Sequence, residues 1–226
     1  MLTVQQMLLL ALAALPYIGV LAWLLISHRT KEFSLSGVFL GLFDIVIALG
    51  AGVVALLIII GSFPQTNSTL TNSFLVGVFA AMMGVALVVG EFFRYMILKP
   101  NEKEEKSPLA GLSFGVGVSL GEYIFFVVMT VMNQDYTITI DMTLMLLADI
   151  LIQLGISVVA YELIRQNNFA FIAVGGLYYL SMFLLMVLNT STVLTVAAKV
   201  IVLGIVIALF IAYLPGKKRS REGSLS

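Results

Sequence analysis

The chain has 226 residues, of which 61% are hydrophobic and only 11% are charged, and its mean hydropathy is +1.10. No water-soluble core of this length requires so apolar a composition, so we predict a polytopic membrane protein. The 12 basic and 12 acidic residues balance, which gives no indication of a nucleic-acid partner. Because the sequence contains no cysteine, disulfides, thiolate catalysis and cysteine metal sites are excluded.

The predicted fold class is all-α, a polytopic transmembrane helical bundle. In lipid each segment must satisfy its own backbone polar groups, and the apolar runs are far longer than the roughly 10 residues of a barrel strand. Because a transmembrane helix needs about 20 apolar residues, we expect about seven spans. In chain order they cover roughly 4–27, 36–61, 73–98, 108–132, 142–164, 169–188 and 193–214.

The first apolar run, 4–27, is expected to be an uncleaved span. Residues 1–6 contain no basic residue, and the run is longer than the apolar region of a signal peptide, which has roughly 7–15 residues. The loops are short, so we expect one transmembrane helical domain over 1–214, followed by a basic, disordered cytoplasmic tail at 215–226. The absence of a convincing internal repeat weighs against the inverted-repeat transporter folds.

Basic residues gather in alternate connections between the spans. The connections 62–72, 133–141 and 189–192 contain neither lysine nor arginine. The positive-inside rule therefore places the N-terminus outside and the C-terminus in the cytoplasm, in what we expect to be the cell membrane. The basic residues on the cytoplasmic side are Arg29, Lys31, Arg94, Lys99, Lys103, Lys106, Arg165, Lys217, Lys218, Arg219 and Arg221.

Six ionisable side chains lie well inside the predicted spans. Each costs at least ~2.5 kcal/mol on insertion scales, so each should face the bundle and have a partner. Asp149 and Lys199 lie about seven and six residues from the outer ends of their spans, and at ~1.5 Å per residue they share a depth. We predict that they form an intramembrane ion pair, with a proton or ion relay as the alternative. The six residues are Asp44, Glu91, Arg94, Glu122, Asp149 and Lys199.

A second group of charges lies near the inner face. Glu91, Arg94 and Tyr95 are spaced i, i+3 and i+4, which places them on one face of a helix, and Asp44 reaches a similar depth. A structural cluster of Asp44, Glu91 and Arg94 is one interpretation. The alternative is a candidate polar cleft that also includes Glu122 and that serves binding or catalysis.

Small residues dominate the predicted span 108–132. They form overlapping small-xxx-small pairs, which let helix backbones approach closely. Because the pairs lie on several sides of the helix, we expect a central helix with many neighbours. Glu122 follows near the middle of the span, and we expect its carboxyl group to be protonated or paired. The glycines predicted to pack helices are Gly111, Gly115, Gly117 and Gly121.

The motifs of soluble catalytic sites are missing from the sequence. His28 is the only histidine and lies in a predicted loop. The sequence contains no phosphate-cradling glycine-rich loop, no serine nucleophile with its base and no set of carboxylates for two metals. We therefore predict no catalytic residue, no bound metal and no cofactor.

Two segments together resemble a known family. Gly90-Glu91-Phe92-Phe93-Arg94-Tyr95 resembles the Glu-Glu-x-x-Arg-aromatic helix end of the YhfC-type intramembrane metalloproteases, and 114–122 resembles their Phe-Gly-Ile-Gly-His-Gly-Gly-Ile-Glu helix. These enzymes are similar in turn to the CAAX-protease and PrsW-like group. The resemblance implies a helical membrane bundle in which Glu91, Arg94, Gly115, Gly117 and Glu122 keep the positions of the family motif.

The same resemblance identifies three departures. Gly90 stands where the family has the first glutamate, and Val118 and Tyr178 stand where it has histidines. Such an enzyme would use imidazoles to hold a metal and a carboxylate to activate its water. The resemblance therefore implies a scaffold that has lost its metal ligands.

We expect a non-catalytic binding or regulatory membrane protein. Its surroundings would be the lipid bilayer, and its partner a membrane peptide, a protein or a hydrophobic ligand. One alternative is an active intramembrane protease with an atypical site. Another is a small-molecule transporter, or its substrate-binding subunit, in which Glu122 and the pair Asp149–Lys199 line a route.

Overall fold

The structure is a computed structural model that describes residues 3–28, 30, 33–62, 72–99, 109–132, 138–188 and 192–213. Its regular elements are all helices, as predicted, and their ends lie within two residues of the predicted ones except where the first span is divided. The predicted tail at 215–226 lies outside the described residues. The helices are α1 (Val4–Ala13), α2 (Leu15–Ile26), α3 (Leu35–Ser62), α4 (Asn72–Leu98), α5 (Leu109–Met132), α6 (Ile140–Arg165), α7 (Ala170–Leu188) and α8 (Thr192–Tyr213).

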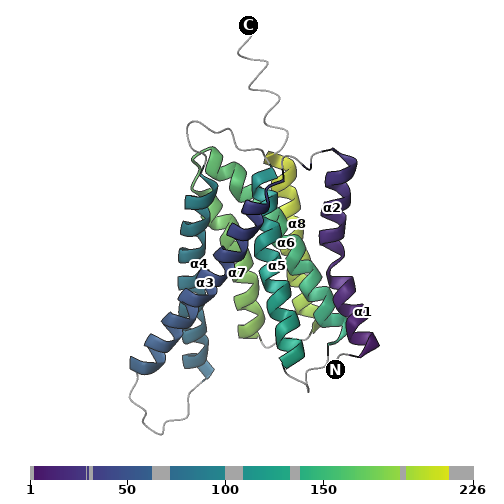
Figure 1. Ribbon diagram of the computed structural model, residues 1–226. Coiled ribbons are helices and arrows are strands. Elements are labelled where there is room, and N and C mark those ends of the chain that lie inside the picture. The colour runs from purple at the N-terminus through teal and green to yellow at the C-terminus, as the bar shows by residue number, and fades with distance from the viewer. Residues whose placement is uncertain are drawn as a thin grey trace.

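The helices form a bundle in which several members could cross a membrane (Figure 1). Within the described residues, α3, α4, α5 and α6 are each long and apolar enough to do so, and the bent pair α1 and α2 would add a fifth span if it crosses as one. Shorter apolar stretches lie in α7 and α8, at Ala170–Tyr179 and Lys199–Ala208. The fold is thus all-helical, with four to five candidate spans.

The first predicted span is not one continuous helix. It is divided into α1 and α2, which meet at a bend of 44°. Pro16 lies at the start of α2; it has no N–H to donate, and its ring would clash with the carbonyl of Leu12 in a continuous helix. The hydroxyl group of Tyr123 in α5 donates to the Leu10 carbonyl at 3.2 Å. A side chain from another helix therefore supports the end of α1 at the break.

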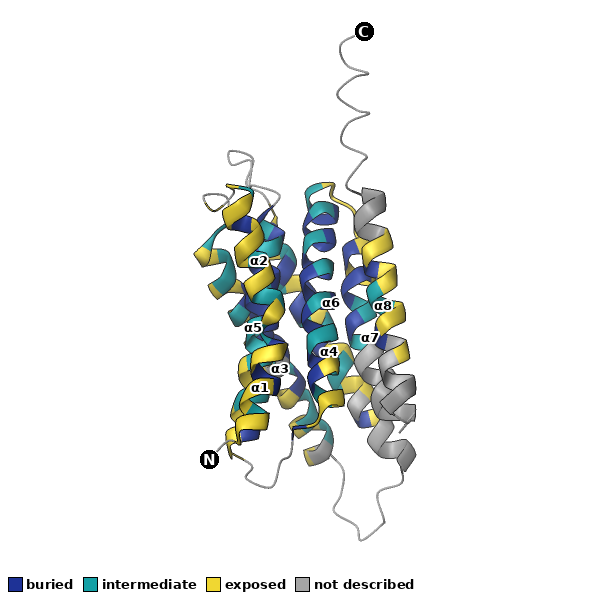
Figure 2. Ribbon diagram, turned by 90° about the vertical axis from the view of Figure 1, so that its right-hand side faces the viewer, coloured by how far each residue is buried: buried dark blue, intermediate teal, exposed yellow. Residues whose placement is uncertain are grey.

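The most buried helix is α6, which lies beside α5, the glycine-rich helix that was predicted to have many neighbours. α6 contacts α1, α2, α4, α5, α7 and α8, whereas the main contacts of α5 are with α3 and α6. In the most apolar stretch of α6, 56% of the residues are buried, compared with 35% in that of α5. Figure 2 shows buried residues along the length of α6. Its buried residues include Ile150, Ile152, Leu154 and Ile156, which point in different directions around the helix. A helix that is apolar all round is typical of a buried position.

Glycines allow α5 to approach α3 until their backbones touch. A Cβ atom added to Gly41 would lie 3.0 Å from the Cα of Gly117 and would overlap the Phe114 carbonyl, and one added to Gly117 would overlap the Val38 carbonyl. Further along the same interface, a Cβ atom on Gly121 would overlap the side chain of Ile45. The pair Gly37-xxx-Gly41 of α3 thus faces Ser113-xxx-Gly117 of α5.

The other side of α5 packs against α6 in the same way. A Cβ atom on Gly111 would lie 2.6 Å from the Tyr161 Cβ, and one on Gly115 would lie 2.8 Å from the Ser157 Cβ. The small residues of α5 therefore serve two interfaces, α3 on one side and α6 on the other. Close packing on these two sides fixes α5, and with it Glu122, at a defined place in the bundle.

Candidate polar site inside the bundle

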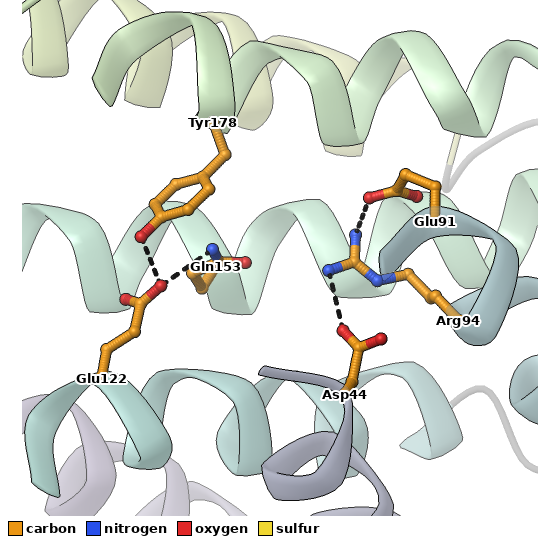
Figure 3. A network of polar contacts seen from close by, with 6 residues as sticks. All are labelled: Asp44, Glu91, Arg94, Glu122, Gln153 and Tyr178. Carbon is orange, nitrogen blue, oxygen red and sulfur yellow. Dashed lines mark hydrogen bonds and ion pairs between the residues drawn. The ribbon is translucent and has the colours of Figure 1, made fainter. Parts of the chain in front are cut away.

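Arg94 joins two acidic side chains inside the bundle. Its Nη1 donates to Oε1 of Glu91 at 2.8 Å, and its Nη2 lies 3.7 Å from Oδ2 of Asp44 (Figure 3). Glu91 and Arg94 lie on one face of α4, whereas Asp44 comes from α3. All three residues are at most 4% exposed. Arg94 therefore does not extend to solvent but crosslinks α3 and α4 in the core.

The guanidinium group and the Glu91 carboxylate are held by their surroundings. The Arg94 Cζ lies 5.6 Å from the centroid of the Phe114 ring of α5, within the range of a cation–π contact. Gly175 of α7 lies against the Glu91 carboxylate so closely that an added Cβ atom would overlap it. Gly90 has little free space either, because a Cβ atom there would lie 3.2 Å from the Tyr179 hydroxyl oxygen. Four helices thus enclose this group.

Glu122 belongs to a second group, which joins α5, α6 and α7. The Tyr178 hydroxyl donates to Oε1 of Glu122, and the Gln153 side-chain amide donates to the same oxygen at 3.2 Å (Figure 3). Tyr178 and Gln153 are 6% and 2% exposed, whereas Glu122 is half-buried. Glu122 is therefore the most accessible of the four residues predicted to line a polar cleft.

The structure divides the predicted cleft into these two groups. In Figure 3 the Glu122 side chain points toward Tyr178 and Gln153, while Asp44 and Glu91 point toward Arg94. Val118 stands where the family resemblance would place a histidine. It is buried in the main apolar cluster, which also contains Phe114. The polar residues are thus spread through a packed core.

Asp149 and Lys199 form the ion pair expected from their equal depth. The Lys199 ammonium group donates to Oδ2 of Asp149, and the two side chains are 4% and 9% exposed. The pair crosslinks α6 and α8. Asp149 lies one turn before Gln153, so α6 carries residues of both this ion pair and the Glu122 group.

Three oxygen atoms along α6 are buried without a hydrogen-bond partner. They are Oδ1 of Asp149, Oε1 of Gln153 and Oγ of Ser157. The three residues are spaced i, i+4 and i+8, which places them on one side of the helix. Buried polar atoms are usually paired, so the row is unusual: two of its atoms are acceptors, and the third belongs to a hydroxyl group that can donate or accept.

Several of these residues were not singled out by the sequence. Gln153 was hidden in the apolar run Ile152-Gln153-Leu154, although a neutral amide at that depth could have indicated it. Gly41 could have been found from the spacing Gly37-xxx-Gly41. No sequence pattern pointed to Gly175. Tyr178 was indicated only by the family resemblance, which has a histidine at that position.

The residues described by the structure include no group of three or more histidine, cysteine, aspartate or glutamate side chains that could hold a metal ion. The chain matches no protein-family model, no curated protein and no solved structure. The fold and the site together define an all-helical protein with several candidate membrane spans and a buried polar core.

Proposed function

We propose that this chain is an integral protein of the cell membrane that binds a membrane-embedded partner and does not hydrolyse it. We propose seven spans, with α1 and α2 crossing together and with α7 and α8 each crossing once. The N-terminus then lies outside and the C-terminus in the cytoplasm. The alternating distribution of basic residues supports this arrangement, and so do the apolar stretches in α7 and α8.

The observation that carries the proposal is the hydrogen bond from Tyr178 to Glu122. If the chain has the scaffold of the YhfC-type metalloproteases, residue 178 is a position for a metal-binding histidine, and Glu122 is a carboxylate of the motif. Here the tyrosine hydroxyl donates to that carboxylate, and a phenol in this role fixes a side chain in place. Val118, at the other histidine position, is an apolar core residue.

The remaining motif residues are also engaged in holding helices together. Glu91 accepts from Arg94, which in turn faces Asp44. A carboxylate that activates a water molecule needs a free lone pair directed at a reacting centre, and a catalytic zinc site needs three protein ligands with an open position. Glu91 is instead paired within α4 with Arg94, which links α4 to Asp44 of α3. The two histidine positions of the motif hold Val118 and Tyr178, so no imidazole completes such a site. We therefore favour a scaffold without hydrolytic chemistry.

Glu122 is the residue through which we propose that the partner is contacted. It is half-buried, whereas Asp44, Glu91 and Arg94 are buried. Two and three residues further along α5, Ile124 and Phe125 are 47% and 58% exposed. A polar group beside an exposed apolar surface suits a membrane peptide, a second membrane protein or a small hydrophobic ligand.

Crosslinking in native membranes tests the binding. Wild type and Glu122→Gln would be crosslinked, purified through an affinity tag and compared by mass spectrometry. We expect a component that is captured by wild type and lost from Glu122→Gln. Glu162→Gln is the matched control, since Glu162 pairs with Arg165 near the end of α6, away from the polar core. Equal capture by wild type and Glu122→Gln would contradict the proposal.

A cleavage assay tests the absence of hydrolysis. Purified protein supplemented with zinc would be incubated with a panel of transmembrane peptides in detergent. We expect intact peptides at every time point. Cleavage that disappears in Glu91→Gln would instead identify an active intramembrane protease.

A further inference from the structure

The polar core contains more acidic than basic side chains. Within the described helices, the carboxyl groups at this depth are those of Asp44, Glu91, Glu122 and Asp149, and the basic groups are those of Arg94 and Lys199. Lys199 is paired with Asp149, and Arg94 lies between Glu91 and Asp44. The ion pairs found among the described residues do not include Glu122.

The hydrogen bonds to Glu122 do not replace a counter-charge. Both donors, the Tyr178 hydroxyl and the Gln153 amide, are neutral, and both bind the same oxygen, Oε1. Neutral donors stabilise a carboxylate only partly, and a charge held away from water without a cationic partner is strongly unfavourable. Among the described residues, the Glu122 carboxyl group therefore has hydrogen-bond donors but no ion-pair partner.

The oxygen atoms nearby extend this deficit. The Gln153 side chain donates through its nitrogen, and its Oε1 is buried without a partner. One turn earlier on α6, Oδ1 of Asp149 is also buried and unpaired. Both residues are less than a tenth exposed. Oxygen acceptors without donors, beside a carboxyl group without a counter-ion, form a site suited to a positive charge.

We propose that Glu122 binds a monovalent cation, either a proton or Na⁺, inside the bundle. A proton would convert the carboxylate into a neutral acid that still accepts at Oε1. A sodium ion would be neutralised by the carboxylate and would use carboxyl oxygens as ligands. The site does not depend on the partner proposed above, and it can be tested on purified protein without that partner.

The charged and titratable groups around Glu122 come from every neighbouring helix. Arg94 and Lys199 are paired with their own acidic partners and act on Glu122 without forming an ion pair with it. On α3, which packs against α5, the ionisable residue Asp44 faces Arg94. The groups that interact with Glu122 are Tyr17 of α2, Arg94 of α4, Asp149 and Gln153 of α6, Tyr178 and Tyr179 of α7, and Lys199 of α8.

Thermal unfolding of the purified full chain in detergent tests the proposal in two series. In the first, NaCl is replaced by KCl or N-methylglucamine chloride at constant ionic strength. In the second, pH is varied without Na⁺. A cation that binds the folded state alone raises the ratio of folded to unfolded protein, by about 100-fold when its concentration is 100 times its Kd. The variants are Glu122→Gln and the matched control Glu162→Gln.

Each outcome decides the question. A rise in unfolding temperature with Na⁺ that Glu122→Gln loses and Glu162→Gln keeps would assign a sodium site. An advantage of wild type over Glu122→Gln that shrinks as pH rises, without an effect of Na⁺, would assign a proton site, because deprotonation restores the uncompensated charge. If wild type and Glu122→Gln respond identically in both series, the proposal is wrong.

Two measurements that do not need Glu122→Gln cover the case in which that variant does not fold. Saturable broadening of the sodium-23 magnetic resonance signal would show bound Na⁺. An infrared carbonyl band of a protonated carboxyl group, shifted in deuterated water and altered in Tyr178→Phe, would show the bound proton at Glu122. The absence of both signals from folded wild-type protein would overturn the proposal.

Discussion

Tyr178 of α7 and Glu122 of α5 are joined by a hydrogen bond across the interior of the bundle. The residues are 56 positions apart in the sequence, and Gln153 of α6 donates to the same carboxyl oxygen. Three helices therefore meet at one atom, Oε1 of Glu122. A substitution at Glu122 should therefore alter the packing of all three helices as well as the binding of the proposed partner.

Replacing Tyr178 by phenylalanine should destabilise the protein by about 0.5–3 kcal/mol, the range for a hydrogen bond to a carboxyl group from its neutral to its charged form. The ring is kept, so the loss reports the hydroxyl group. Tyr95→Phe is the matched control, because the Tyr95 ring stacks on Phe171 at 5.6 Å between centroids and should keep that contact. The free energy of unfolding in mixed detergent micelles measures both. A loss in Tyr95→Phe as large as that in Tyr178→Phe would contradict the assignment.

The extents of the helices could be predicted from the sequence, whereas their places in the bundle could not. An apolar run of about 20 residues determines a helix by its length alone. Small residues on α5 predicted close approach, but they do not say how many neighbours a helix has. The side chains of Ile150, Ile152 and Ile156 decide that α6 is central, and a run of apolar residues looks the same whether it faces lipid or protein.

The candidate site shows the same division. Charges inside long apolar runs stand out in the sequence, and their spacing predicted the contact of Glu91 with Arg94 and the pairing of Asp149 with Lys199. Tyr178 and Gln153 are neutral and therefore inconspicuous, and Tyr178 is one of eight tyrosines. Which tyrosine reaches Glu122 depends on the register between α5 and α7, which is set by tertiary packing.

Neutralising one partner of the Asp149–Lys199 pair should destabilise the protein strongly. Asp149→Asn leaves the Lys199 ammonium group buried without its counter-ion, and breaking a buried pair costs about 3–5 kcal/mol. Glu162→Gln provides the comparison, because the Glu162–Arg165 pair is partly exposed, with side chains 19% and 26% accessible. Such pairs contribute about 0–1 kcal/mol. Denaturation in detergent should separate the two variants clearly.

The double variant Asp149→Leu/Lys199→Met should recover most of the stability lost by Asp149→Asn. Replacing a buried ion pair by apolar side chains of similar size is often neutral or stabilising. The same denaturation series measures it. If the double variant is as unstable as the single one, the pair contributes more than a mutual neutralisation of charge, and the alternative of an ion relay through it gains support.

Alanine at Gly117 should weaken the contact between α3 and α5. The added Cβ atom would overlap the Val38 carbonyl, which belongs to the backbone and cannot rotate away. Forcing a methyl group into a packed interface costs about 1–3 kcal/mol. Gly84→Ala in α4 should have the opposite sign, because nothing lies within 4 Å of its added Cβ atom and alanine favours a helix by about 0.8–1.0 kcal/mol over glycine. Unfolding temperatures that fall for both variants would contradict this interpretation.

Gly175 and Gly176 offer the closest comparison in the chain, because they are adjacent residues of α7 with different surroundings. A Cβ atom on Gly175 would overlap the Glu91 carboxylate, whereas the nearest atom to one on Gly176 is Cδ2 of Leu87 at 3.9 Å, an ordinary contact. Gly175→Ala must therefore either displace α7 or push Glu91 away from Arg94. For Gly175→Ala we expect the free energy of unfolding to fall by about 1–3 kcal/mol because of overpacking, and for Gly176→Ala we expect no fall.

Combining Gly175→Ala with Glu91→Ala removes the carboxylate that the added methyl group meets, so the two changes together should cost less stability than the sum of each alone. Strict additivity would show that Gly175 acts on the bundle without involving Glu91.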